Sequence, residues 1–313
     1  MNYSTSKYPS KGNEELFYYY WKANSKVANK GVIQLSHGIG EHAGRYNRIA
    51  TILQEQGFDV YGNDHRAHGK SVKSKKLLGV YKGENYFDDA VEDMRHLTLI
   101  IKKEHPNKKI ILFGHSMGSL LSRKYVTKYG DDLDALILSG TASYMKGLGF
   151  IGITTAKVTC AINGRVREND FLNSLVFGEF NRKFKPNRTK FDWLSRDEKI
   201  VDLFDNDPDR AENFSLGVFL DIIKASKQIN SKPIYKATPK NLPIYLFSGD
   251  KDPVGEMGKG VKKISKQYKK AGVKDLTLKL YKDGRHEMLN EINKEEVEQD
   301  LLNWLNSKIN GKQ

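Results

Sequence analysis

The sequence has almost no cysteine and no long apolar run. Its single cysteine, Cys160, cannot form an intrachain disulfide or a cysteine-based metal site, which excludes a disulfide scaffold. The longest apolar stretch, residues 147–162, is interrupted by Lys157 and falls short of the roughly 20 residues that a membrane-spanning helix needs. Residues 1–12 are polar and lack the apolar core of a signal peptide. We therefore expect a cytoplasmic protein without a membrane span.

Acidic residues are outnumbered by basic ones. The 313 residues include 52 lysines and arginines against 38 aspartates and glutamates, so the formal net charge is +14. Such an excess favours contact with anionic lipid surfaces or with nucleic acid. The lysines are spread along the chain and form no single basic arm, which favours an ordinary solvated surface and no nucleic-acid partner. Peripheral contact with an anionic membrane stays open, and the oligomeric state is not predicted.

Short β-rich runs alternate with amphipathic segments, a pattern typical of βαβ units and a mostly parallel sheet in an α/β fold. The run at 109–114 (KIILFG) is continuously apolar, as in a strand that is buried on both faces. Predicted strands lie at 15–22 (antiparallel), 31–37, 59–63, 109–114, 133–139, 243–248 and 276–281, and predicted helices at 47–56, 85–105, 116–129, 260–271 and 295–308.

The alternation stops between residues 143 and 239, where the pattern shows helical patches and no convincing strand. A structureless loop of that length is uncommon in a compact domain. We therefore predict an α/β core formed by residues 1–142 and 240–313, flanked by helices, with a largely helical cap formed by residues 143–239.

A nucleophile motif follows one of the predicted buried strands. Residues 114–118 read Gly-His-Ser-Met-Gly, which matches G-x-S-x-G with an apolar strand before it and a helix after it. This context predicts that Ser116 sits on a sharp strand-to-helix turn with its hydroxyl exposed above the sheet. The alternative is an ordinary strand–helix turn in which the serine caps the helix.

A serine nucleophile on such a turn needs an acid and then a histidine later in the chain. His286 is the one histidine of the eight that follows Ser116. Asp250 and Asp252 both follow the predicted strand 243–248, at the end of the strand where the acid is expected. Spacing does not decide between these two aspartates.

The chain also carries several longer motifs. They are SHGIGEH at 36–42, GRY at 44–46, DHRAHGKS at 64–71, GHSMG at 114–118, GDKDP at 249–253 and HEMLNE at 286–291. Together they resemble the monoacylglycerol lipase and lysophospholipase group of α/β-hydrolases, which is also described as the serine aminopeptidase-like hydrolase family. The resemblance covers nearly the whole chain outside the predicted cap and implies an α/β-hydrolase fold.

The resemblance implies a role for each catalytic position. Ser116 would be the nucleophile and His286 the general base, and the G-x-x-D pattern of the family selects Asp252 as the acid. The backbone N–H groups of Ile39 and Met117 would form the oxyanion hole. Ile39 departs from the family, in which a smaller residue is common, and this larger side chain would narrow the acyl entrance.

Four further residues are predicted to bind or shape the substrate site. His37 and Arg45 would shape the oxyanion loop, with loop scaffolding as the alternative. Phe150 and Phe171, with other apolar residues of the predicted cap, would line an acyl tunnel, unless they form the core of the cap itself. His115 is expected to pack beneath the nucleophile turn and not to act in catalysis.

The function implied is a serine hydrolase that cleaves lipid-like monoesters, either monoacylglycerols or lysophospholipids, through an acyl-enzyme. No metal or cofactor is expected. The alternatives within the same fold are a short-chain carboxylesterase, a thioesterase, an acyltransferase or a peptidase, and a non-catalytic binding protein is a further alternative.

Overall fold

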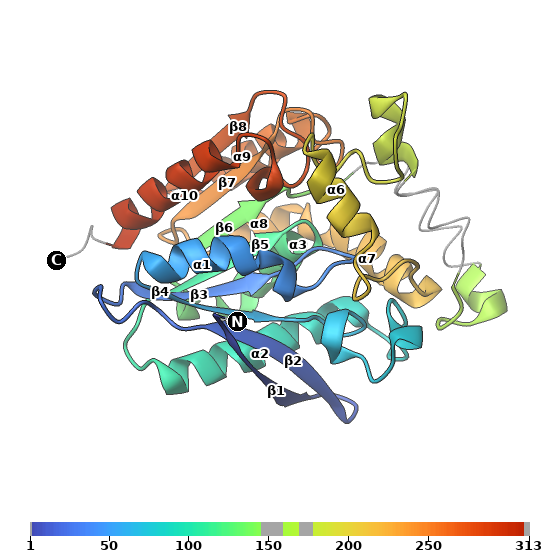
Figure 1. Cartoon of the computed structure of the whole chain (residues 1–313), viewed down its shortest axis with the longest axis horizontal. Helices are drawn as coiled ribbons and strands as arrows, with labels where there is room; N and C mark the ends of the chain where they lie inside the picture. Colours follow the sequence, from blue (N-terminus) through green and yellow to red (C-terminus); the bar gives the residue numbers. More distant parts are fainter. Residues whose placement is uncertain (1, 145–158, 169–177, 310–313) are drawn as a thin grey trace.

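The computed structural model describes residues 2–144, 159–168 and 178–309. Within these residues, strands form one sheet of eight in the order β1-β2-β4-β3-β5-β6-β7-β8 (Figure 1). The strands are β1 (Ser4–Ser10), β2 (Glu14–Trp21), β3 (Gly31–Ser36), β4 (Phe58–Asn63), β5 (Ile110–His115), β6 (Ala135–Ser139), β7 (Ile244–Gly249) and β8 (Leu276–Tyr281).

The pairing of the strands confirms the mostly parallel sheet. β2 pairs antiparallel with β1 and β4, whereas β4, β3, β5, β6, β7 and β8 run parallel to one another. β3, β4, β5, β6 and β7 are buried along their whole length, which confirms the prediction made for the apolar run at 109–114. The carboxyl ends of these parallel strands therefore meet at one edge of the sheet.

Strand β1 was not predicted from the sequence. Its residues, STSKYPS, are polar and exposed except for Tyr8, so they lack the apolar alternation that marks a strand. β1 is the edge strand, where Pro9 is tolerated because one row of backbone groups has no neighbouring strand. Pairing with the aromatic β2 holds it in place, and this pairing is not visible in its own sequence.

Helices cover both faces of the sheet (Figure 1). One face carries α2 (Tyr86–Glu104), α3 (Met117–Tyr129), α8 (Lys232–Ala237) and α9 (Lys259–Lys270), and the other carries α1 (Asn47–Glu55) and α10 (Lys294–Ile309). Successive residues of a strand point to opposite faces of the sheet and contribute to two hydrophobic cores, one on each face. Val32 and Leu112 pack on the α2–α3 side, whereas Ile33 and Ile111 pack on the α1–α10 side.

The described part of the segment between β6 and β7 is largely helical, as predicted. It contains α6 (Glu198–Asp205), α7 (Leu216–Ile229) and α8, and its one described β-contact is an isolated bridge between Glu168 and Ser215. In Figure 1, α6 and α7 lie beside the edge of the sheet at which the parallel strands end.

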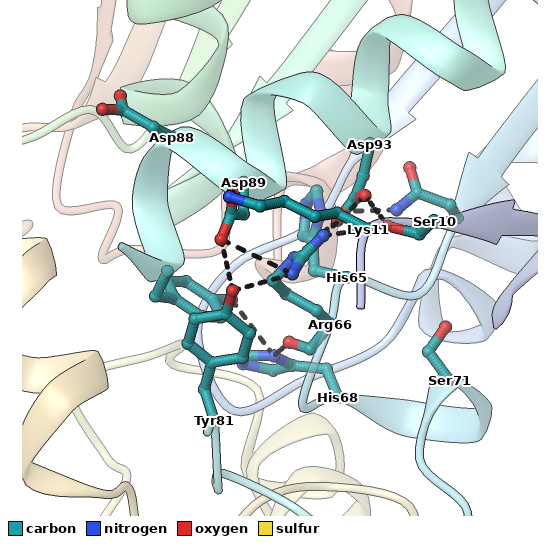
Figure 2. Close-up of polar contacts among 12 residues, drawn as sticks. Ser10, Lys11, His65, Arg66, His68, Ser71, Tyr81, Asp88, Asp89 and Asp93 are labelled. Atoms are coloured by element: carbon teal, nitrogen blue, oxygen red, sulfur yellow. Dashed lines mark hydrogen bonds and ion pairs between the residues drawn. The ribbon is translucent and has the colours of Figure 1, made fainter. Parts of the chain in front are cut away.

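A buried ion pair braces the loop that follows β4. The Arg66 guanidinium donates from Nε and Nη2 to the two carboxylate oxygens of Asp93 on α2, each at 2.7 Å. It also donates to the hydroxyls of Tyr81 and Ser10, both at 2.9 Å (Figure 2). Arg66 and Asp93 are 3% and 2% exposed, so this geometry joins the loop, the helix and the β1–β2 turn in a dry environment.

We expect Arg66→Ala to lower the free energy of unfolding by about 3–5 kcal/mol, because Asp93 would remain buried without its counter-charge. Lys128→Ala is the matched control, since Lys128 pairs with Glu92 on the surface and its loss costs at most about 1 kcal/mol. Urea unfolding followed by circular dichroism measures both values. Equal losses in the two variants would contradict the bracing role of Arg66.

Candidate active site

Ser116 occupies a strained turn between β5 and α3. Its φ of +51° and ψ of −118° lie in a region that non-glycine residues rarely adopt. The flanking glycines make the turn possible, since a Cβ at Gly118 would overlap the carbonyl oxygen of Ser36 and a Cβ at Gly114 would overlap the hydroxyl of Ser122. The turn leaves Ser116 partly exposed, whereas its neighbour His115 is buried.

His286 lies against Asp252 at the same edge of the sheet. The His286 ring nitrogen Nδ1 is 3.0 Å and 3.1 Å from the two carboxylate oxygens of Asp252. A carboxylate only accepts hydrogen bonds, so Nδ1 carries the proton and Nε2 is the basic nitrogen. Nε2 is buried and has no hydrogen-bond partner among the described residues, and His286 lines the same cavity as Ser116.

The surroundings of this pair favour charge on both members. Burial raises the pKa of Asp252, but the interaction with His286 and hydrogen bonds from Ser248 and from the Val254 backbone bring it below its ordinary value. Burial lowers the pKa of His286, but the Asp252 carboxylate outweighs that effect and raises it above the ordinary value.

Of the two aspartates that the spacing left open, Asp252 is the one that contacts His286. Asp250 instead accepts a hydrogen bond of 2.8 Å from the backbone N–H of Asp283. The bond holds the loop after β8 in place and gives Asp250 a structural role in the turn. Gly140, at φ +57°, leaves room for the histidine ring, since a Cβ there would lie 2.9 Å from His286 Cε1.

The two predicted oxyanion donors flank the nucleophile. Met117 is the first residue of α3, so its N–H has no helical acceptor and lies at the positive end of the helix dipole. Ile39 follows Gly38, where a Cβ would lie 3.1 Å from Ser116 Cβ. No described residue accepts the N–H of Ile39. Both groups suit a developing negative charge beside Ser116.

A buried ion network joins the oxyanion loop to the His286 loop. Arg45 donates two hydrogen bonds of 2.9 Å to the carboxylate of Glu287 and one of 2.6 Å to Glu41. Glu41 in turn accepts the backbone N–H of Gly38 at 2.6 Å. Burial raises the pKa of Glu287, but the Arg45 guanidinium lowers it to about 2. The network therefore fixes the position of the Gly38 loop relative to the His286 loop.

The arrangement around His37 and Arg45 favours the scaffolding alternative. His37 is fully buried, and its Nδ1 donates to the Gly38 carbonyl at 2.7 Å while its Nε2 accepts the His65 backbone N–H at 2.9 Å. Arg45 is committed to Glu41 and Glu287 and stacks 4.6 Å from the ring centroid of Phe204. Neither side chain lines the cavity at Ser116.

His115 packs beneath the turn, as predicted. Its ring lies 4.7 Å from that of His286, and Ser139 is 3.3 Å from its Nδ1. Burial lowers the pKa of His115 to about 4, so the ring is neutral at pH 7.

Apolar residues of the segment between β6 and β7 line the cavity at Ser116. They are Phe191, Trp193, Leu194, Phe204, Ala211 and Phe214. The sequence analysis did not select them, although the run FDWL at 191–194 is an aromatic cluster that could have been noticed. Phe150 and Phe171, which it did select, lie outside the described residues.

Contacts anchor this segment to the catalytic loops. The Glu287 backbone N–H donates to the Leu194 carbonyl at 2.8 Å, and Arg285 donates to the Ser195 carbonyl at 3.1 Å. On the other side, His42 of the oxyanion loop lies 2.9 Å from the carboxylate of Asp207. The cavity walls and the catalytic loops are therefore tied together on two sides.

Two negative findings apply to residues 2–144, 159–168 and 178–309. No group of three or more histidine, cysteine or carboxylate side chains there could hold a metal ion. No helix within the same residues combines the length and the apolarity needed to cross a bilayer.

Residues 27–293 match the family model described as serine aminopeptidase, S33. The chain belongs to this family. Curated S33-like relatives include a monoacylglycerol lipase from Mycolicibacterium smegmatis, 27% identical with 95% of both chains covered. A monoglyceride lipase from Mus musculus is 27% identical over 93% of this chain and 86% of its own length.

Among solved structures, a thermostable carboxyl esterase from Bacillus coagulans, in complex with glycerol, is 26% identical and superposes with a TM-score of 0.91 over 99% of both chains. The similarity confirms the α/β-hydrolase fold that the motifs implied.

We expect Glu287→Gln to lose a pH-dependent part of the stability. The pKa of Glu287 is depressed in the folded state, so its contribution is complete above the unfolded pKa of about 4.5 and disappears as the pH falls towards 2. The difference in unfolding free energy between wild type and variant should be on the order of 3 kcal/mol at pH 6 and should shrink across that window.

The control for this measurement is Glu295→Gln, because Glu295 is exposed in the first turn of α10. Urea titrations from pH 2 to pH 7 give the free energies. A wild-type–variant difference for Glu287→Gln that does not change with pH would rule out the ion network as its origin.

Proposed function

We propose that the protein is a serine hydrolase that cleaves lipid-like carboxylic monoesters through an acyl-enzyme. The observation that carries the proposal is the His286–Asp252 pair: His286 lines the same cavity as Ser116 on its strained turn, and its Nε2 has no hydrogen-bond partner among the described residues. Membership of the S33 family and the lipase and esterase relatives support the same chemistry.

In the proposed reaction, the Ser116 hydroxyl oxygen attacks the ester carbonyl carbon while His286 Nε2 takes the hydroxyl proton. Asp252 keeps the imidazole in the tautomer protonated at Nδ1 and stabilises the imidazolium that forms. His286 then gives the proton to the leaving alkoxide, and the alcohol departs. A water molecule, activated by the same nitrogen, cleaves the acyl-enzyme and releases the acid.

The N–H groups of Ile39 and Met117 would stabilise the oxyanion of each tetrahedral intermediate. Loss of one such donor from a preorganised site costs on the order of 3 kcal/mol of transition-state stabilisation. The larger side chain of Ile39 leaves this role intact because the backbone donates. Burial of Gly38 and Gly40 on either side keeps the loop rigid, so little reorganisation is needed during the reaction.

The proposal includes a cap formed by residues 143–239 over a core formed by residues 1–142 and 240–313. Support comes from Phe191, Trp193 and Phe204, which belong to this segment and line the cavity above Ser116. An apolar wall at this position suits an acyl chain, because its burial removes hydrocarbon from water at about 25 cal/mol per Å².

The cavity favours a neutral head group on the substrate. Its described lining includes the carboxylates Glu41, Glu212 and Glu287 and no lysine or arginine side chain. Arg45 pairs with Glu41 and Glu287, but Glu212 is exposed and has no cationic partner among the described residues. A phosphate near the ester would meet negative charge without a compensating cation. We therefore favour a monoacylglycerol over a lysophospholipid or a coenzyme A thioester.

The proposal extends to the setting of the enzyme: a cytoplasmic protein that takes a small lipid ester and makes peripheral contact with an anionic membrane. The net charge of +14 supports the membrane contact, and nucleic acid is not included as a partner.

We expect Ser116→Ala to abolish ester hydrolysis and Asp252→Asn to lower kcat by about 10⁴-fold, as the wrong histidine tautomer does in comparable triads. Asp250→Asn is the matched control and should stay within about threefold of wild type, since Asp250 bonds only loop backbone. Steady-state kinetics and labelling by a fluorophosphonate probe measure these effects. The reverse ranking of the two aspartate variants would show that the acid has been assigned wrongly.

The pH profile offers a second readout of the triad. His286 can act as a base only when its imidazole is neutral, and Asp252 raises the pKa of His286 in the folded protein. As the pH is lowered, kcat/KM should therefore begin to fall at a pH above the ordinary imidazole pKa. In Asp252→Asn the fall should move to lower pH, because the carboxylate that raises the pKa is gone. An unchanged acid limb would contradict the pairing.

We expect a higher kcat/KM for a monoacylglycerol than for the lysophosphatidic acid with the same acyl chain. Glu212→Lys should reduce that preference by about tenfold, because it replaces repulsion of the phosphate by attraction. Glu295→Lys, in the first turn of α10 and outside the cavity lining, makes the same charge change and should leave the preference as it is. A wild-type preference for the phosphate-bearing ester would overturn the assignment of the head group.

A further inference from the structure

Three helices carry most of the net positive charge of the protein. α7, α8 and α9 contain ten lysines, and every one of them is exposed. They are Lys224, Lys227, Lys232, Lys236, Lys259, Lys262, Lys263, Lys266, Lys269 and Lys270. Within the described chain, none of the ten forms an ion pair. We refer to these ten residues as the lysine layer.

Acidic residues are almost absent from the same helices. Their one carboxylate, Asp221, is 6% exposed and pairs with Arg165. Ten lysines and one aspartate give α7, α8 and α9 a net charge of +9, compared with +14 for the whole chain. Repulsion between so many like charges destabilises the fold, and a surface of opposite charge would relieve that repulsion.

Tertiary structure assembles the layer. α8 packs against both α7 and α9, although strand β7 and the Asp252 loop separate α8 from α9 in the sequence. The apolar faces of the helices turn inward, with Val218, Ile234 and Ile264 in one hydrophobic core. The ten lysines are exposed on the outer surfaces of these packed helices.

The layer begins beside the candidate active site. α7 starts two residues after Phe214, which lines the cavity at Ser116. α9 starts seven residues after Asp252, and Gly260 in its first turn lies close to Ser143. The amino-terminal ends of α7 and α9 therefore lie near the edge of the sheet that carries the cavity. From there the lysine layer extends towards the opposite edge, where the Lys274 N–H donates to the Lys240 carbonyl just before β8 and β7 begin.

We propose that the lysine layer docks the protein onto an anionic lipid surface. The inference rests on the proposed function, because a lipid ester substrate is found in such surfaces. Lysine suits this partner, since a mobile ammonium group can follow a diffuse and fluid layer of negative charge. Each lysine near such a surface strengthens binding by about fivefold.

Nucleic acid fits the lysine layer less well. The three helices contain no arginine, whose planar group reads guanine edges and stacks on bases. Their aromatic residues, including Phe219, Tyr235 and Tyr268, are buried and cannot serve as stacking platforms. The layer offers charge without base recognition.

The test measures binding of the full chain to sucrose-loaded vesicles of phosphatidylcholine with 0% to about 30% phosphatidylserine. Binding should rise with the anionic fraction and fall as salt shortens the Debye length. A variant with Lys262, Lys263, Lys266, Lys269 and Lys270 all changed to Gln should lose at least about 100-fold in partitioning. The matched control changes five exposed lysines elsewhere to Gln, namely Lys22, Lys26, Lys73, Lys82 and Lys103, and should lose less than about tenfold.

The outcomes separate the docking surface from the enzyme activity. The wild type and the two lysine variants should hydrolyse a soluble short-chain ester at the same rate. If the wild type does not hydrolyse this ester, the proposed function is refuted, but the measurement of vesicle binding remains valid. Equal loss of vesicle binding in both variants would overturn the lysine layer as the docking surface. Tighter binding of wild type to mixed-sequence duplex DNA than to the anionic vesicles at the same salt would overturn the lipid partner.

A second measurement needs no variant. Vesicle-bound wild type should show several-fold slower acylation of the α9 lysines by an amine-reactive reagent than the free protein, read by mass spectrometry. Lys22 and Lys73 should react equally in both states. Uniform protection, or none, would contradict docking through this layer.

Discussion

The candidate active site depends on the parallel pairing of β3, β5, β6, β7 and β8, because this pairing brings the carboxyl ends of five strands to one edge. The oxyanion loop leaves from β3, Ser116 from β5, Asp252 from β7 and His286 from β8. Strands buried on both faces give these loops a rigid base. The strain at Ser116 is tolerated there because β5 and α3 are packed tightly on both sides of the turn.

Two buried ion networks perform different tasks in this framework. Arg66 and Asp93 join the loop after β4 to α2 and to Ser10 at the end of β1, in the part of the sheet formed by β1, β2 and β4. Arg45, Glu41 and Glu287 act within the site, where they hold the oxyanion loop against the residue that follows His286. Buried pairs of this kind add little net stability, but removal of one partner is costly, so each network favours a single arrangement of its loops.

The signs of charge are separated on the molecule. Carboxylates line the cavity at Ser116, whereas α7, α8 and α9 carry exposed lysines that form no ion pair with the described residues. An anionic surface would attract the flank of the protein, and the cavity itself would admit a neutral ester more readily than a charged one. Because positive and negative charges lie in different places, the net charge of the whole chain could not distinguish an anionic lipid surface from nucleic acid as the partner.

Local sequence determined the strands at 31–37, 109–114 and 243–248, the nucleophile turn at Ser116 and the identity of His286, because each depends on neighbouring residues or on chain order. Tertiary structure alone decided what depends on distant residues. It brought Asp252 rather than Asp250 to the histidine, placed Phe191 and Trp193 in the cavity wall, paired the polar β1 with β2 and packed the lysine-bearing α8 against α7 and α9. Spacing along a chain constrains which strand or helix a residue belongs to, but the direction of its side chain relative to residues a hundred positions away follows only from how those elements pack.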